Sequence, residues 1–204
     1  MIDKEKEKYM KIYHNKGIYT KNGKIDETGN IRKKYGHENN GKPFIKFIKK
    51  MKISSLVDIG CGHNEFVELI KNKLGIKAIG VDFACPSADF IADAADLPFE
   101  DKEFDLVTCF DCLEHIPEEK IDKVLSEFRR VAKRFLVMPC LRGAPSRIDH
   151  CQLHVCKKDS DWWLDKVKNS CHDICQISYY KRKRMVGKKQ ANKLVIYGIY
   201  ENLL

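Results

Sequence analysis

Two aspartates and a glycine turn have the types and spacing of a nucleotide-binding corner. Asp58 ends an apolar run just before Gly60-Cys61-Gly62, and Asp82 lies 20 residues after Gly62. Because glycine has no Cβ, such a turn can take positive φ and let a ligand approach the main chain closely. A carboxylate about 20 residues further on can accept from both hydroxyls of a ribose. The pattern therefore indicates a site for a ribose-bearing ligand.

The turn alone is a weaker signal than its surroundings. The third glycine of the dinucleotide fingerprint is missing, and Asn64 stands in its place. Asn tolerates left-handed geometry and caps helices, so the turn survives the change. Taken by itself, the turn is equally consistent with a short structural connection between a strand and a helix.

Apolar patterns on both sides predict the elements that position this turn. The segment 53–59 has the length and apolar content of a buried parallel strand, and residues 64–74 place apolar side chains on one helical face. The segment 75–82 reads as a second buried strand that ends in Asp82. The helix after the turn would point its free N–H groups at the ligand.

The following box, FIADAADLPFEDKEFDLVTCFD (residues 90–111), and the LEHI segment (113–116) identify a family. From about Ile53 to Pro139 the chain resembles class I S-adenosylmethionine-dependent methyltransferases of the small-molecule group, methyltransferase type 11. The resemblance implies an α/β fold: a seven-stranded, doubly wound sheet of order 3-2-1-4-5-7-6, with strand seven antiparallel and helices on both faces. The cofactor it implies is S-adenosyl-L-methionine, bound outside the carboxyl ends of the strands.

By this resemblance the glycines line the methionine part of the cofactor, and Asp58 organises its ammonium end. Asp82 would hold the ribose hydroxyls, and Asp93 would accept from the adenine amino group. A backbone carbonyl after the fourth strand would accept from the methionine ammonium. The residues expected at the cofactor are Asp58, Gly60, Cys61, Gly62, Asp82, Phe83, Asp93, Ala94, Phe110 and Asp111.

Two histidines are candidate general bases for an acceptor that carries a proton. His115 lies just past the fourth predicted strand, and His154 precedes the tryptophan-containing helix. Either one could instead be a hydrogen-bonded structural histidine. Cys140, after the fifth strand, is a weaker candidate nucleophile. DNA amino methyltransferases carry an Asn/Asp-Pro-Pro-aromatic segment after the fourth strand, and the DCLE sequence here argues against that class.

The remaining patterns divide the chain into two parts. We expect residues 1–41 to form an N-terminal helix and loop that act as a lid or substrate segment, and residues 42–204 to form the methyltransferase domain. Tyr19, Tyr35 and His37 are candidate substrate contacts in the first part. The further predicted elements are a helix at 3–13, a helix at 42–51, strands at 90–93, 104–110 and 134–139, a helix opening at Pro117, a helix at 160–168, and a hairpin of 171–180 and 193–200 joined by the basic connection 181–190.

Cysteine and histidine content raises the question of a metal site. The nine cysteines are an odd number, which excludes a complete disulfide framework, and buried free thiols are the favoured interpretation. No repeated C-x-x-C knuckle accompanies the cluster, so we expect no metal there, and a structural zinc is the alternative. The cluster comprises His150, Cys151, His154, Cys156, Cys171, His172 and Cys175.

Charge and hydropathy limit the kinds of partner that the protein is expected to have. The net charge of +9 comes from the flanks, because residues 51–150 carry more acidic than basic side chains. No apolar run has the ~18 residues of a membrane span, so we expect a soluble, cytoplasmic protein without a membrane partner. We predict methyl transfer to an oxygen or nitrogen of a small-molecule or glycan-like acceptor. The alternatives are an RNA or DNA acceptor gripped by the basic segment 181–190, or an inactive binding module; the oligomeric state is left open.

Overall fold

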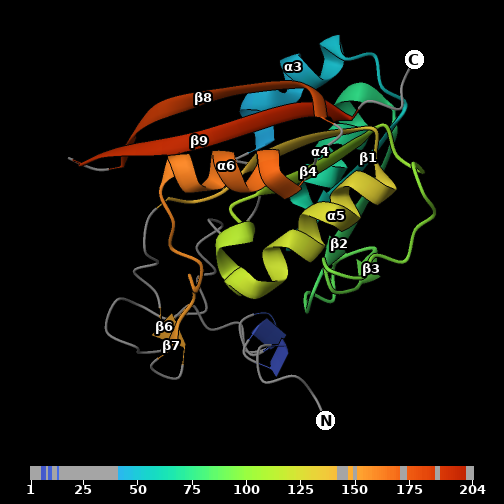
Figure 1. The fold of residues 1–204 in the computed structure, drawn as a ribbon. Helices are drawn as coiled ribbons and strands as arrows, with labels where there is room; N and C mark the ends of the chain where they lie inside the picture. Colours follow the sequence, from blue (N-terminus) through green and yellow to red (C-terminus); the bar gives the residue numbers. More distant parts are fainter. Residues whose placement is uncertain are drawn as a thin grey trace.

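A seven-stranded, mostly parallel sheet is the centre of the fold (Figure 1). Its order is β3-β2-β1-β4-β5-β9-β8, in which β9 pairs antiparallel with both β5 and β8. This arrangement confirms the predicted order 3-2-1-4-5-7-6 with an antiparallel seventh strand. The computed structural model describes residues 6, 7, 9, 10, 13, 41–141, 147–148, 151–170, 174–186 and 189–200.

The predicted strands and helices that fall within these residues are present. The strands of the large sheet are β1 (Ser55–Ile59), β2 (Lys77–Asp82), β3 (Phe90–Ile91), β4 (Leu106–Phe110), β5 (Arg134–Met138), β8 (Ile174–Val186) and β9 (Lys189–Tyr200). The helices are α3 (Ile45–Lys50), α4 (Glu65–Leu74), α5 (Ile121–Val131) and α6 (Ser160–Ser170), with 3-10 turns η1 (Lys42–Phe44), η2 (Leu113–His115) and η3 (Glu118–Lys120). A separate pair, β6 (Arg147–Ile148) and β7 (Cys151–Gln152), was not predicted. In the N-terminal segment, residues 6, 7, 9, 10 and 13 are helical.

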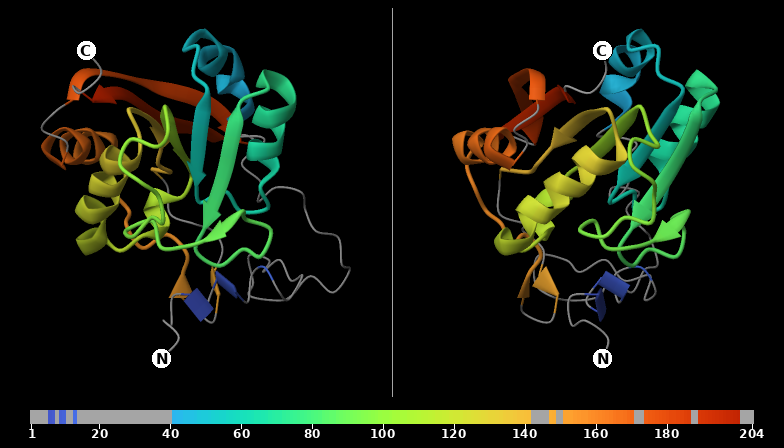
Figure 2. Two further views of the ribbon diagram at one scale, coloured as in Figure 1. Left: turned by 90° about the vertical axis from the view of Figure 1, so that its right-hand side faces the viewer. Right: turned by 45° about the vertical axis from the view of Figure 1, so that its right-hand side comes forward.

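Alternating side chains bury both faces of the sheet under helices. In β4, Val107 and Cys109 point into the core beneath α5 and α6, whereas Leu106 and Phe110 point into the core beneath α3 and α4. The two helix layers lie on opposite sides of the strands (Figure 2). These helices are short and amphipathic, and none within the described part of the chain has the length and apolar character to cross a membrane.

The turn between β1 and α4 has the left-handed backbone that its sequence predicts. Gly60 has φ 76°, and a Cβ there would lie 2.4 Å from the sulfur of Cys112, so a larger residue does not fit. Asn64 has φ 65° at the N-cap of α4. Its side chain does not cap the helix, and instead its amide donates to Asp89 Oδ2 at 3.1 Å. The turn is thereby tied to the loop that follows β2.

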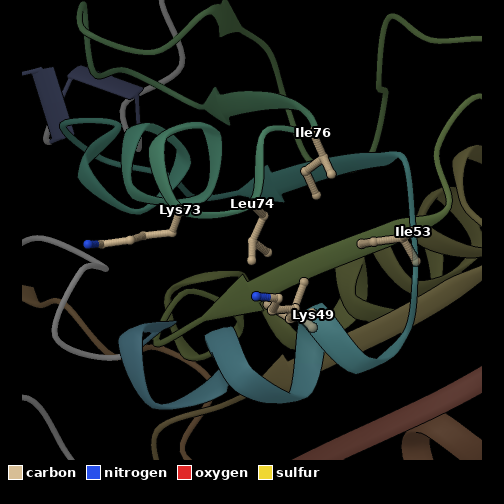
Figure 3. A pocket seen from close by; sticks show the side chains of 6 residues that line it. Lys49, Ile53, Lys73, Leu74 and Ile76 are labelled. Atoms are coloured by element: carbon tan, nitrogen blue, oxygen red, sulfur yellow. The ribbon is translucent and has the colours of Figure 1, made fainter.

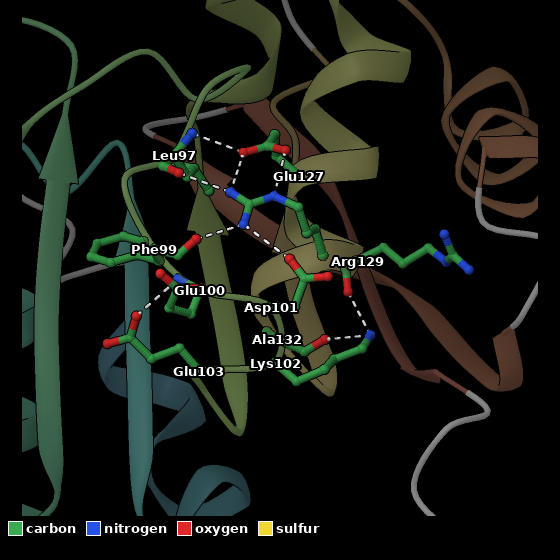
Figure 4. Close-up of polar contacts among 10 residues, drawn as sticks. Leu97, Phe99, Glu100, Asp101, Lys102, Glu103, Glu127, Arg129 and Ala132 are labelled. Carbon is green, nitrogen blue, oxygen red and sulfur yellow. Dashed lines mark hydrogen bonds and ion pairs between the residues drawn. The ribbon is translucent and has the colours of Figure 1, made fainter.

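An ion pair between buried Glu127 and half-buried Arg130 holds the loop before β4 against α5 (Figure 4). The Arg130 guanidinium donates to both carboxylate oxygens of Glu127 and to the backbone carbonyls of Leu97 and Phe99. Glu127 also accepts the Leu97 N–H at 2.8 Å. Asp101, which is largely exposed, adds a 3.3 Å contact to Arg130. We call these five residues the Glu127–Arg130 network; it fixes the DLPF segment at the amino edge of the sheet.

The terminal hairpin corrects one prediction. Lys181–Gln190 was expected to be a connection, but the backbone ladder continues through it, from Lys181 paired with Leu194 to Val186 paired with Lys189. Lysine and arginine hide the strand signal because they interrupt hydrophobic alternation, and here the strand is evident only from its backbone pairing. Since Val137 of β5 pairs with Ile196, this basic hairpin arm (residues 181–186 and 189–193) extends past the carboxyl end of β5.

Candidate active site

The residues predicted to contact the cofactor lie in or just after the ends of four strands. Asp82 ends β2, and Asp111 directly follows β4. Because β1 to β4 are parallel, these ends share the carboxyl edge of the sheet. The helical residues of the N-terminal segment lie beyond the same edge (Figure 2). In doubly wound sheets, ligands bind at this edge.

The Asp82 carboxylate is 7% exposed and is fixed by several donors. Its Oδ1 accepts the N–H groups of Ala84 and Cys85, both at 2.9 Å. Its Oδ2 accepts the Gly62 N–H at 3.1 Å and the hydroxyl of Tyr13 at 3.3 Å. Gly62 therefore positions Asp82 directly, and the Tyr13 hydroxyl contacts Oδ2 of the carboxylate that the sequence predicts to accept a ribose hydroxyl.

Tyr13 comes from the N-terminal segment and is held on both sides. Its ring makes an edge contact with His63, with centroids 5.5 Å apart. Burial, followed by the negative charge of Asp82, raises the pKa of the Tyr13 phenol above its usual value. The phenol therefore stays protonated and acts as a donor to the carboxylate.

Two of the predicted cofactor residues have side chains that belong to the core. Asp58 is fully buried, and its Oδ1 accepts the Thr108 hydroxyl at 2.6 Å. The ring of Phe110 packs against Phe44 and Phe66 at centroid distances of 5.4 Å each. The side chain of Phe110 is thus used in packing, and its backbone is the part that faces the edge of the sheet. Neighbouring Cys61 is also buried, and burial raises the pKa of its thiol.

Asp93 and Phe83 lie in more open surroundings. Asp93 Oδ1 accepts the Ala95 N–H at 2.9 Å, and Oδ2 lies 3.3 Å from the Lys120 ammonium. Ala94, which directly follows Asp93, is half-buried. The ammonium of Lys6 lies over the Phe83 ring, 5.6 Å from its centroid. Neither the contact of Lys120 with Asp93 nor that of Lys6 with Phe83 was expected from the sequence.

The structure brings the two candidate bases together around a buried glutamate. The rings of His115 and His154 meet edge to face, with centroids 4.7 Å apart. Glu114 Oε1 lies 4.0 Å from Nε2 of His115 and 3.8 Å from Nε2 of His154. Glu114 is completely buried, and its Oε2 accepts the Cys140 N–H at 3.1 Å. We call Glu114, His115 and His154 the Glu-His-His cluster.

A backbone carbonyl and a tyrosine orient His115. Its Nδ1 lies 3.1 Å from the carbonyl oxygen of Leu153 and 3.0 Å from the hydroxyl oxygen of Tyr9. Because a carbonyl only accepts, Nδ1 carries a proton in its contact with Leu153, and in the neutral ring this leaves the lone pair on Nε2. Tyr9 also donates to Leu153 at 3.4 Å. The basic nitrogen of His115 is therefore the one that faces Glu114.

Sequence reasoning missed the parts played by Glu114, Tyr9 and Tyr13. Glu114 directly precedes His115, and the tyrosines are four residues apart, which places both on one side of a helix. These two spacings are the features of the sequence from which the contacts could have been predicted. The proposed contacts Tyr19, Tyr35 and His37 lie outside the described residues.

Six cysteines in the described part of the chain form no disulfide. They are Cys61, Cys85, Cys109, Cys112, Cys140 and Cys156. Burial raises the pKa of Cys109 and of Cys156, which agrees with thiols that pack as small hydrophobic groups. Of the Cys/His cluster singled out in the sequence, His150, Cys171 and His172 lie outside the described residues.

A pocket of about 180 Å³ lies away from these residues (Figure 3). Its lining consists of Ile48, Lys49, Ile53, Lys73, Leu74 and Ile76. Ile53 and Ile76 come just before β1 and β2, so the pocket is at the amino edge of the sheet. No predicted site residue lines it.

Comparisons with known proteins agree with the fold. Residues 57–135 match the family described as "Methyltransferase domain". Tocopherol O-methyltransferase from Arabidopsis thaliana is 35% identical over 41% of this chain and 28% of its own length. Demethylmenaquinone methyltransferase from Staphylococcus carnosus is 31% identical over 71% of this chain and 64% of its own length. The chain thus spans less than two thirds of these relatives.

Solved structures show the same architecture. A SAM-dependent methyltransferase from Archaeoglobus fulgidus superimposes with a TM-score of 0.59 and 17% identity, covering 79% of this chain and 92% of that one. A Haemonchus contortus phosphoethanolamine N-methyltransferase in complex with S-adenosyl-L-methionine gives a TM-score of 0.60 and 14% identity, covering 79% of this chain and 52% of that one. The fold is that of the class I methyltransferases. Within the chain, residues 57–135 are similar to a methyltransferase domain, and these relatives and neighbours are what the chain resembles.

Proposed function

We propose that the protein transfers a methyl group from S-adenosylmethionine to an oxygen or nitrogen of a small-molecule or glycan-like acceptor. The contacts of two N-terminal tyrosines carry this proposal: Tyr13 reaches Asp82, and Tyr9 reaches His115. A site covered by the chain's own residues at both of these points suits an acceptor small enough to be enclosed. The names of the relatives, which specify tocopherol and demethylmenaquinone, also point to small molecules.

The same tyrosines support a division of labour along the chain. Residues 1–41 would form the segment that covers the site, and residues 42–204 would form the methyltransferase domain. Tyr9 and Tyr13 are four residues apart, so one helical face can reach the acceptor side and the ribose side together. Such a cover would exclude water and hold the acceptor in one orientation.

The residues at the carboxyl edge fit the cofactor. Asp82 Oδ2 already accepts one hydroxyl, from Tyr13, which is the interaction that a ribose would make. At Gly60 the place of a Cβ is filled by Cys112, so glycine is the residue that lets the turn keep its left-handed backbone there. Asp93 offers a carboxylate to the adenine amino group and Ala94 its backbone N–H, while Asp111 lies beside the methionine end.

When bound, the cofactor supplies a methyl group that is electrophilic without activation. The task of the chain is then to align the acceptor, which can contribute several kcal/mol to lowering the barrier. His115 can accept the acceptor's proton at Nε2, because Leu153 holds the other ring nitrogen as N–H. His154 packs edge to face on this ring and limits its rotation. The imidazole of His115 would take the proton that the acceptor atom loses as it is methylated.

One observation favours the second candidate, an RNA or DNA acceptor. By register, the backbone of the basic hairpin arm continues beyond the carboxyl end of β5, the edge that holds the site. An arm of that charge could bind phosphates beside the active site. If the arm binds about six phosphates, raising the salt from 50 to 200 mM would lower the affinity for nucleic acid roughly 10³-fold. The affinity for a small acceptor would hardly change.

The decisive experiment follows labelled methyl groups from the cofactor into fractions of a cell extract, with and without nuclease. The small-molecule proposal expects label in a low-mass fraction that survives nuclease treatment. Loss of the labelled product after nuclease would reject it in favour of the nucleic-acid acceptor. A His115→Gln variant, with cofactor affinity measured in parallel, separates loss of the base from loss of the cofactor site.

A further inference from the structure

We propose that the Glu-His-His cluster binds a divalent transition-metal ion on the acceptor side of the active site. An ion site is a property beyond methyl transfer itself, and ion binding can be measured without any acceptor. It replaces the expectation, drawn from the sequence, that the site holds no metal. Three features support it: the convergence of the ligand atoms, their orientation by neighbouring groups, and the chemistry of the donor set.

The ligand atoms converge on one point. One side-chain donor atom from each of the three residues lies within 4.8 Å of those of the other two. Glu114 Oε1 is 3.8 Å from His154 Nε2 and 4.0 Å from His115 Nε2. Bonds of 2.0–2.2 Å to a common ion would place two ligand atoms about 3–3.5 Å apart. The two distances from Glu114 would have to shorten by about 1 Å or less, and the distance between the two histidine nitrogens by up to about 1.8 Å, to close the site around an ion.

Neighbouring groups hold each ligand in the orientation that an ion requires. The Cys140 N–H occupies Oε2 of Glu114, which leaves Oε1 directed at the two imidazoles. The Leu153 carbonyl accepts from Nδ1 of His115, so the lone pair of Nε2 is the one that faces Glu114. Metal-binding histidines are commonly fixed in this way, by a carbonyl on the other ring nitrogen.

Backbone hydrogen bonds join the two segments that supply the ligands. The carbonyl oxygen of Glu114 accepts the N–H groups of Val155 at 2.9 Å and Cys156 at 3.0 Å. These bonds bring the segment containing His154 against η2, although the two are far apart in sequence. The site is thus built by the main chain as well as by the side chains, and it does not depend on long, mobile side chains.

The donor set selects the kind of ion and suggests its use. Two imidazoles and one carboxylate suit zinc and neighbouring divalent ions of the first transition series, whereas calcium and magnesium prefer oxygen ligands alone. Three protein ligands leave at least one position open, as in catalytic zinc sites. With Nε2 of His115 bound to the ion, that nitrogen would no longer be available as the base. The ion would take over its part, since an acceptor hydroxyl bound there would lose its proton more readily because the ion stabilises the oxygen anion.

A second group of donors sharpens the test. Asp111, Glu114 and Cys140 also place one ligand atom each within 4.8 Å of one another, and they share Glu114 with the first group. A cobalt(II) ion distinguishes the two sets, since thiolate ligation adds a strong near-ultraviolet band that nitrogen and oxygen ligands lack. The proposal expects cobalt bound without that band.

The experiment uses the full chain, stripped with chelator and titrated with zinc and cobalt by calorimetry and absorption spectroscopy. We expect one ion per chain, and an affinity at least tenfold weaker in His154→Gln and in Glu114→Gln. His63→Gln is the matched control, because this histidine contacts Tyr13 and Cys85 and should leave metal affinity unchanged. The His154 variant keeps the test valid if the buried Glu114 variant fails to fold.

Three results would overturn the proposal. They are no stoichiometric binding by the stripped wild-type protein, equal affinity in wild type and His154→Gln, and a thiolate band that disappears in Cys140→Ser. S-adenosylmethionine affinity, measured on the same metal-free samples, reports separately on the cofactor site. Failure of the metal site and failure of the methyltransferase proposal are therefore distinguishable.

Discussion

Two buried glutamates, one at each edge of the sheet, are held in different ways. Glu127 at the amino edge accepts from the Arg130 guanidinium with both oxygens and from the Leu97 N–H. Glu114 at the carboxyl edge accepts the Cys140 N–H and faces two imidazoles at 3.8 and 4.0 Å. A guanidinium keeps its charge at every pH a protein meets, whereas an imidazole can lose its proton or bind an ion.

This difference separates a stabilising carboxylate from a functional one. The hydrogen bonds from Arg130 lower the pKa of Glu127, so its charge is permanent at neutral pH. The histidines that face Glu114 can change their protonation, and they lie at the carboxyl edge of the sheet. The amino edge is thus expected to control the free energy of unfolding, and the carboxyl edge to control binding.

The largest expected effect is the loss of the Glu127 carboxylate. Glu127→Ala removes the carboxylate that accepts from the Arg130 guanidinium and from the Leu97 N–H. The loss should lower the free energy of unfolding by about 3 kcal/mol. Urea denaturation followed by circular dichroism measures this. Asp101→Ala is the control, because its side chain is 78% exposed and its contact with Arg130 should contribute less than about 1 kcal/mol. Equal effects in the two variants would contradict the comparison.

The next effect is on cofactor affinity, at the opposite edge. Asp82→Ala removes a buried, charged acceptor, so binding of S-adenosylmethionine should weaken by about 1.5–3 kcal/mol, which is roughly tenfold or more. Calorimetry measures it, after circular dichroism has verified the fold, because three backbone N–H groups also lose their acceptor. Asp93→Ala should act in the same direction but less, since its side chain is 36% exposed. A folded Asp82→Ala protein with wild-type affinity would refute the ribose site.

Acid should reduce the stability that Glu127 contributes at the amino edge. The pKa of Glu127 is lower in the folded protein than its usual value near 4.5. A lowered folded pKa means that the carboxylate stabilises the fold fully above about pH 4.5, and that this contribution is lost as the pH falls through the folded pKa. Denaturant titrations of wild type and Glu127→Gln between pH 7 and pH 3 should therefore converge at the acidic end. Parallel curves over the whole range would show that the ion pair does not set this pH dependence.

Much of the fold could be predicted because its signals are local. Each parallel strand is a short apolar run bounded by polar residues, and the glycine turn marks the change from strand to helix. The basic hairpin arm was misjudged because alternation of apolar and polar residues, the signal for a strand, is absent from Lys181–Gln190. There the backbone pairing with β9 decides the structure.

The site was predictable where a motif specifies it and not where tertiary contacts build it. Asp82 and Asp93 follow strands whose ends must share one edge. The meeting of His115 with His154 depends on backbone bonds between Glu114 and the segment 155–156, which sequence spacing does not reveal. The contacts of Tyr9 and Tyr13 likewise depend on where the N-terminal segment folds back.

The smallest effect tests whether Tyr13 competes with the cofactor. Its hydroxyl occupies Oδ2 of Asp82 at 3.3 Å, so a ribose hydroxyl must displace it. Tyr13→Phe keeps the ring against His63 but removes that competitor. Since a typical hydrogen bond contributes about 0.5–1.5 kcal/mol net, calorimetry should show S-adenosylmethionine binding tightened roughly two- to tenfold.

Tyr9→Phe is the matched control for this change, because its hydroxyl contacts His115 and Leu153 instead of Asp82. Its cofactor affinity should equal that of the wild type. Weaker binding in Tyr13→Phe would mean that the hydroxyl moves from Asp82 onto the bound cofactor and contributes a contact there. The carboxyl edge would then be closed by its ligand, whereas the Glu127–Arg130 network at the amino edge is complete without one.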